Sequence, residues 1–79
     1  MDITLYTTLG CHLCDEALEM LMLLKKTELE LNIVNVEIAD SNNLSELYGE
    51  KIPVVQFKGD EIYWPFSVEE LELLINMRK

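Results

Sequence analysis

The feature of this sequence that most constrains its fold is the alternation of short β-branched runs with segments of helical periodicity. Four runs have the composition of strands: 3–6, 31–38, 52–57 and 61–64. Helical patterns fill the intervals 11–26 and 44–48, and a further one begins at Ser67. The order β-α-β-α-β-β-α predicts a parallel pair joined by a crossover, followed by an antiparallel hairpin. We therefore expect an α/β fold with a mixed four-stranded sheet flanked by helices, formed by one domain over residues 1–79.

The two longer helices have apolar stripes and recognisable ends. The first stripe comprises Leu13, Ala17, Met20, Leu21 and Leu24, and the last comprises Val68, Leu71, Leu74 and Ile75. Ser67 and Glu70 have the spacing of a capping box. Turn-forming residues 40–43 precede the short helix, Gly49 follows it, and 58–60 form a tight turn.

Charge and composition exclude several kinds of partner. Six basic residues face fifteen acidic ones, for a formal net charge of −9, which disfavours nucleic acids and anionic membranes as partners. No run reaches the ~18 apolar residues of a membrane span, and the N-terminus lacks the basic region of a secretory signal. We therefore expect a cytoplasmic monomer, in which a pair of cysteines is more often catalytic or metal-binding than structural.

The two cysteines of the chain lie at the predicted join between the first strand and the first helix, as Cys11-His12-Leu13-Cys14. Backbone N–H groups at a helix N-terminus stabilise a thiolate. Cys11 is thus the expected attacking thiol, and Cys14, one turn further on, the resolving thiol. No Lys or Arg precedes Lys25 while acids crowd the first turns, so we expect only modest activation. His12 either interacts with the Cys11 sulfur or simply faces solvent.

Other interpretations of the pair stay open. Two cysteines at this spacing form half of a zinc site, which would need donors from a second chain. They can also be small buried hydrophobes or a structural disulfide. In a further alternative the acidic surface binds a partner and the cysteines have no role.

The stretch Leu5–Ala17, which contains Cys11-His12-Leu13-Cys14-Asp15-Glu16-Ala17, resembles the "CHLCDEA" signature of a bacterial family of short glutaredoxin-like proteins. Residues 47–55, with Tyr48-Gly49 and Ile52-Pro53-Val54, resemble the same family's "YG…IPV" segment. The resemblance covers essentially the whole chain. It implies the thioredoxin-like fold and a redox-active dithiol.

The resemblance also implies a cis peptide bond between Ile52 and Pro53, packed beside the dithiol. Such a turn would expose the backbone N–H and C=O of Ile52 to an extended substrate. Lys51 is the nearby cation for a substrate carboxylate, and Trp64, with Phe66, is a candidate apolar lip.

True glutaredoxins hold glutathione with a basic residue ahead of the dithiol and a glycine turn before the last helix. This chain has Thr7 and Thr8 at the first position and Trp64-Pro65-Phe66-Ser67 at the second. We expect no cofactor, and glutathione is kept only as an alternative co-substrate.

These observations predict a thiol–disulfide oxidoreductase that acts on a protein or small-molecule disulfide, with a disulfide-containing protein or a low-molecular-weight thiol as its partner. The alternative is a non-catalytic thioredoxin-fold binding module that holds zinc or an iron–sulfur cluster across a dimer. The sequence does not identify the substrate or the electron donor.

Overall fold

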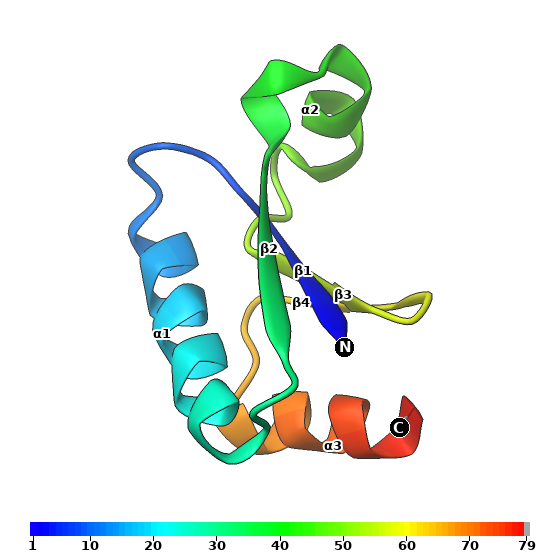
Figure 1. Ribbon diagram of the computed structural model, residues 1–79. Helices are drawn as coiled ribbons and strands as arrows, with labels where there is room; N and C mark the ends of the chain where they lie inside the picture. The colour runs from blue at the N-terminus through cyan, green and yellow to red at the C-terminus, as the bar shows by residue number, and fades with distance from the viewer. Residues whose placement is uncertain (79) are drawn as a thin grey trace.

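The computed structural model describes residues 1–78, and its elements follow the predicted order (Figure 1). They are β1 (Asp2–Thr7), α1 (His12–Thr27), β2 (Asn32–Glu37), the 3-10 turn η1 (Ile38–Asp40), α2 (Asn42–Tyr48), β3 (Val54–Phe57), β4 (Asp60–Tyr63) and α3 (Val68–Arg78). The predicted α/β class is confirmed, and η1 is an addition to the prediction. The predicted third strand is shorter, since Ile52 and Pro53 precede β3, and the predicted fourth strand is shifted by one residue, so that β4 begins at Asp60 and Trp64 follows it.

The four strands form one mixed sheet in the order β2-β1-β3-β4. β1 runs parallel to β2, from the pair Asp2 and Asn32 to the pair Thr7 and Glu37, and antiparallel to β3. A two-residue turn joins β3 to β4, with positive φ at both Lys58 (48°) and Gly59 (90°), the signs that a type I′ hairpin turn requires. The register brings the end of β2 beside the end of β1, where the cysteine loop begins.

The hydrophobic core lies between one face of the sheet, α1 and α3. Alternate side chains of β1 and β3 point into it, as the period of two in a strand requires. α1 and α3 add their buried stripes and contact each other. The core comprises Ile3, Leu5, Ala17, Leu21, Leu24, Leu31, Val55, Phe57, Phe66, Leu71 and Ile75. This packing fixes α1, and with it the position of the cysteines at its first turn.

The opposite face of the sheet is covered in part by α2. The Tyr6 ring of β1 stacks on the Tyr48 ring of α2, with centroids 4.4 Å apart. Tyr6 lies between Leu5 and Thr7 on β1, so its side chain points away from the core. α2 therefore lies on the side of the sheet opposite α1 and α3, at the end where the loop to Pro53 begins (Figure 1).

The first turn of α1 differs from the predicted stripe, whereas the start of α3 agrees with the prediction. Leu13 is 44% exposed, and Cys14 occupies the buried position in that turn of α1. The reason is that the cysteine must face the sheet when Cys11 caps the helix, so its neighbour one residue earlier turns outward. The capping box of α3 is confirmed: the Glu70 N–H donates to Ser67 Oγ (3.2 Å) and the Ser67 N–H donates to Glu70 Oε1 (3.3 Å).

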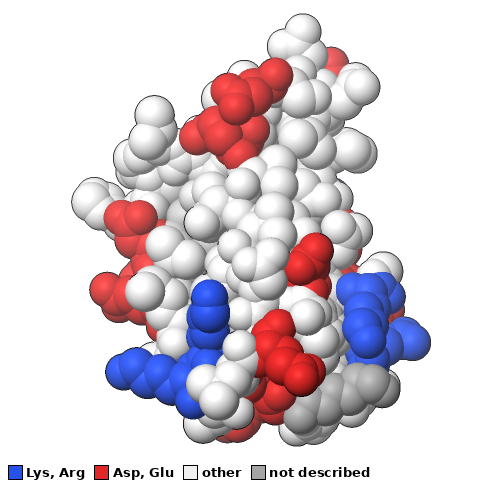
Figure 2. Space-filling model, in the orientation of Figure 1, with Lys and Arg blue, Asp and Glu red and all other residues white. Residues whose placement is uncertain are grey.

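Within the described part of the chain, no helix combines the length and the apolar character needed to cross a membrane. On the face shown in Figure 2, basic side chains gather at the lower end, over the ends of α1 and α3, whereas acidic side chains are distributed along the whole height. Lys25 and Lys26 lie in the last turn of α1, so the cationic end of this helix is the one far from the cysteines.

Candidate functional site

A tight turn connects the end of β1 to the first cysteine. The Cys11 N–H donates to the Thr8 carbonyl (3.3 Å), which closes a four-residue turn. Gly10, at the third position of this turn, has a φ of 80°, the value that a type II turn requires and that residues with a side chain rarely adopt. The glycine therefore sets the direction in which the chain enters α1.

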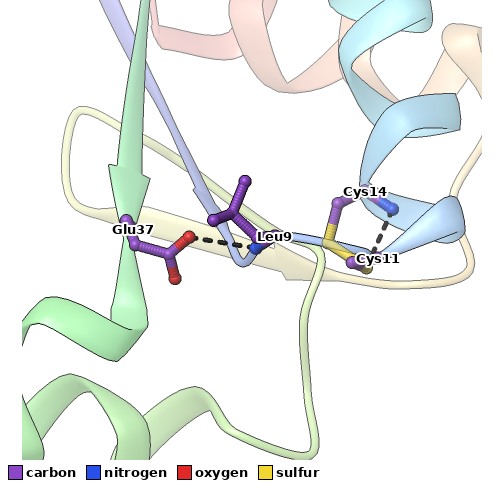
Figure 3. Close-up of a disulfide and its surroundings, with 4 residues drawn as sticks. All are labelled: Leu9, Cys11, Cys14 and Glu37. Atoms are coloured by element: carbon purple, nitrogen blue, oxygen red, sulfur yellow. Dashed lines mark hydrogen bonds between the residues drawn. A yellow bond between two sulfur atoms is a disulfide. The ribbon is translucent and has the colours of Figure 1, made fainter.

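Cys11 is the N-cap of α1, and Cys14 lies one turn below it. Cys11 has extended backbone angles, and its sulfur accepts a hydrogen bond from the Cys14 N–H at 3.1 Å (Figure 3). This N–H belongs to the first turn, whose donors have no partner within the helix. Cys11 is partly exposed, Cys14 is only 2% exposed, and the two sulfurs are joined as a disulfide. The pair is thus at bonding distance, with one sulfur open to a reactant and the other covered.

Glu37, the last residue of β2, holds the turn from the opposite side. One carboxylate oxygen accepts the Leu9 N–H at 3.0 Å (Figure 3). The other accepts the Ala39 N–H, also at 3.0 Å. The pKa of Glu37 is lowered by hydrogen bonds from the Ala39 backbone, the Thr8 side chain and the Leu9 backbone, which outweigh partial desolvation. The carboxylate therefore ties the cysteine loop to the start of η1.

A pocket of about 220 Å³ lies beside the dithiol. It is lined by Leu5, Thr7, Thr8, Leu9, Gly10, Cys14, Asp15, Leu18, Asn35 and Glu37. Its two charged side chains are both carboxylates, so an anionic group is disfavoured on this side of the cysteines.

The Ile52–Pro53 peptide bond is cis, as the resemblance implied. The pairing of Val54 with Tyr6 places Pro53 next to the end of β1, close to where the cysteine loop starts. The prediction that the Ile52 N–H is free for a substrate is wrong. That N–H donates to the Tyr48 carbonyl (3.1 Å) because the chain leaves α2 in a tight turn. Within residues 1–78 the Ile52 carbonyl accepts no hydrogen bond, so a role for it in binding a substrate stays a prediction.

The remaining predicted binding residues, His12, Lys51 and Trp64, differ in exposure and in contacts. His12 is exposed, and within residues 1–78 its imidazole makes no hydrogen bond, to the Cys11 sulfur or elsewhere. Lys51 is exposed, and its ammonium lies 5.7 Å from the Tyr63 ring centroid. Trp64 is half-buried and meets the Phe66 ring edge-on, with centroids 5.1 Å apart.

Phe66 is 5% exposed and belongs to the core, so the suggested lip contains Trp64 without it. A second cis bond, between Trp64 and Pro65, was not predicted.

In residues 1–78 no three His, Cys, Asp or Glu side chains are grouped as ligands for a metal ion. The alternative of a metal shared across a dimer would need donors from a second chain and stays a prediction.

Sequence reasoning missed Glu37 and Tyr48 as parts of this region. The signal for Glu37 is its place at the end of the second strand, since parallel pairing with the first strand sets it beside the loop that follows. Tyr48 was predicted only as the end of the short helix and as part of a family segment. Its aromatic partner on β1 is 42 positions away in the chain and cannot be identified without the register.

Comparison with known proteins gives both a family match and solved structures of similar fold. The family model described as "Glutaredoxin-like domain (DUF836)" matches residues 2–76. The crystal structure of the X. campestris protein XcR50, a structural genomics target, superposes with a TM-score of 0.85 at 32% identity, covering 98% of this chain and 99% of that one.

More distant structural neighbours are thioredoxins. Oxidized thioredoxin O2 from Arabidopsis thaliana has a TM-score of 0.69 at 22% identity, covering 98% of this chain and 73% of that one. The Trichomonas vaginalis thioredoxin has a TM-score of 0.61 at 16% identity, covering 99% and 78%. At these identities the likeness concerns the fold alone. A search among curated protein sequences finds no match.

Proposed function

This chain belongs to the glutaredoxin-like domain (DUF836) family, and from that premise we propose that it is a thiol–disulfide oxidoreductase, with Cys11 as the attacking and Cys14 as the resolving thiol. The observation that carries the proposal is the pairing of a partly exposed sulfur at the cap of α1 with a buried sulfur at bonding distance. The cap position supplies the backbone N–H that favours a thiolate on Cys11.

The proposed reaction begins with the reduced protein. The Cys11 thiolate attacks one sulfur of a substrate disulfide, and the other substrate sulfur leaves as a thiolate that takes a proton from water. Cys14, after losing its proton to solvent, attacks the Cys11 sulfur of the mixed disulfide and releases the second substrate thiolate. The substrate gains two electrons, and the protein is left with the Cys11–Cys14 disulfide. A thiol or dithiol reductant then restores the starting state.

The surroundings of Cys11 favour a protein disulfide in an apolar segment over anionic glutathione as the substrate. Leu9 is 93% exposed and Leu13 is 44% exposed, so the residues two positions before and two positions after Cys11 present apolar surface. Asp15 and Glu37 line the pocket alongside. The Ile52 carbonyl can accept one hydrogen bond from an extended substrate backbone, and Trp64 is the candidate apolar contact beyond it.

The decisive test compares Cys11→Ser and Cys14→Ser with a peptide disulfide as substrate. Cys14→Ser is expected to accumulate a mixed disulfide on Cys11, because the resolving thiol is absent, and Cys11→Ser is expected to form essentially none, because Cys14 is covered. Intact-mass spectrometry after acid quenching measures both adducts. The proposal fails if the two variants form adducts equally fast, or if neither reacts while Cys11 is still open to alkylation.

A further inference from the structure

Glu37 makes a connection that the proposed reaction does not use. It lies at the end of β2, paired in register with Thr7, so its side chain reaches the loop that leads to Cys11. Both of its oxygens are occupied by backbone donors, Leu9 and Ala39, each at 3.0 Å. One carboxylate thus joins two loops, and Figure 3 shows its contact with the loop that carries the attacking cysteine.

Glu37 also accepts a hydrogen bond from the Thr8 side chain, and beyond Glu37 the loop ahead of Cys11 has few anchors. The Leu9 side chain is 93% exposed, and Gly10 has none. Within residues 1–78, the N–H groups of Leu9, Gly10 and Cys11 make two hydrogen bonds: one from Leu9 to Glu37 and one from Cys11 to Thr8 within the turn itself. The hydrogen bond to Glu37 therefore connects these three N–H groups to the sheet.

We propose that Glu37 is a positioning residue for the dithiol: by holding the Leu9 N–H, it keeps the Cys11 sulfur at the N-terminus of α1. At that place the sulfur meets the Cys14 N–H, 3.1 Å away, and the positive end of the helix dipole. The inference rests on the proposed function for its importance, but the geometry it describes is independent of any substrate.

The anchoring role of Glu37 and its negative charge predict opposite changes in the Cys11 pKa when Glu37 is replaced. As a negative charge, the carboxylate opposes a thiolate on Cys11, so its removal by itself would lower the Cys11 pKa and speed alkylation. As an anchor, it keeps the sulfur on the helix N-terminus, so its removal would raise the Cys11 pKa towards that of free cysteine and slow alkylation. Because Glu37 is partly exposed, solvent and salt screen the charge effect, and we expect the anchoring effect to dominate.

The test measures the alkylation rate of Cys11 in the reduced full-length protein, from pH 5 to 10, by intact mass. Glu37→Ala is expected to slow alkylation at pH 7 about three- to tenfold and to raise the apparent Cys11 pKa by the corresponding ~0.5–1 unit. Glu37→Gln keeps one acceptor oxygen for two donors and should lie between Glu37→Ala and the wild type. The matched control is Glu46→Gln on α2, an exposed carboxylate without a hydrogen bond in residues 1–78, which should leave the rate unchanged.

An unchanged or faster rate in Glu37→Ala, with an unchanged or lower Cys11 pKa, overturns the inference. If Glu37→Ala does not fold, Glu37→Gln decides alone: alkylation slower than in both the wild type and Glu46→Gln supports the inference, and an equal or faster rate overturns it. The outcome is separate from the proposed function. A wild type that never forms the Cys11–Cys14 disulfide would remove the oxidoreductase role, whereas the alkylation profile would still show whether Glu37 places the sulfur.

Discussion

Gly10 determines the shape of the turn in front of Cys11. Its φ of 80° lies in the left-handed region, and beyond its two chain neighbours no residue lies within 4 Å of the place a Cβ would take. A methyl group there would therefore meet no packed neighbour, and the cost of adding one comes from the backbone alone. This separates the conformational role of the glycine from any packing role.

We expect Gly10→Ala to lower the free energy of unfolding by about 1 kcal/mol, the cost of holding an L-residue in the left-handed region. Gly10→Asn should cost less, because asparagine adopts this region more readily. Urea denaturation followed by circular dichroism measures both. Equal stability of Gly10→Ala and the wild type would show that the turn relaxes to a different shape.

Single residues show how far the site could be predicted. The roles proposed for Cys11 and Cys14 follow from their position at a strand–helix join, which is visible as a local pattern. The contact between Glu37 and the Leu9 N–H depends on the register of β1 with β2, over a separation of 28 residues, and no local pattern contains it. The Ile52 N–H was predicted free because the sequence does not show how tightly the chain leaves α2.

At the scale of elements, Tyr48 fastens the end of α2 to the sheet. Its hydroxyl donates to Glu61 of β4, and its ring stacks on Tyr6. Its carbonyl accepts the N–H groups of Lys51 and Ile52, at 2.8 and 3.1 Å. The segment that leads to Pro53 is thus held through one residue, which links the packing of α2 to the position of the candidate substrate-binding loop.

We expect Tyr48→Phe to lower the free energy of unfolding by ~1 kcal/mol at pH 7, because the Glu61 carboxylate loses a hydrogen-bond donor while the ring stacking persists. Urea denaturation checks this value. Tyr63→Phe is the matched control, since the Tyr63 hydroxyl also donates to Glu61 (2.9 Å) but lies in the exposed β4 edge rather than at the end of α2.

The same pair gives a pH dependence. The hydrogen bond to Glu61, then desolvation and the charge of Glu61, raise the pKa of Tyr48, and Glu61 likewise raises that of Tyr63. Since the folded state holds the phenol protonated, the stability that it contributes is complete below the ordinary tyrosine pKa of ~10 and is lost as the pH rises further. Wild-type stability should therefore fall more steeply between about pH 10 and 11 than that of Tyr48→Phe. Parallel pH profiles would contradict this role.

The elements themselves were largely predictable, because each has its own periodicity and end signals. The capping box of α3 and the hairpin turn at Lys58 and Gly59 are local patterns, and both are present. Leu13 was placed on the wrong face because its spacing fits the stripe equally well. Only the orientation of Cys14 towards the sheet decides between the two faces.

At the scale of the whole molecule, the parts of the candidate site meet at one end of the structure. The dithiol loop, the end of β2 and the Pro53 loop all meet where β1 ends, as the strand registers require. The last-turn lysines of α1 lie at the other end of that helix. With a formal net charge of −9, the molecule repels anionic reactants at long range, most strongly at low salt. The expectation that nucleic acids and anionic membranes are not partners rests on this charge and stays a prediction.

The central claim, that Cys11 and Cys14 interconvert between a dithiol and a disulfide, is tested most directly by equilibrating the wild-type protein in glutathione buffers of graded ratio. The thiols are then trapped with acid and the products weighed. We predict a single transition in which the protein loses two hydrogens as the disulfide forms. A protein that keeps both hydrogens at every ratio, with Cys11 still open to alkylation, would contradict the account.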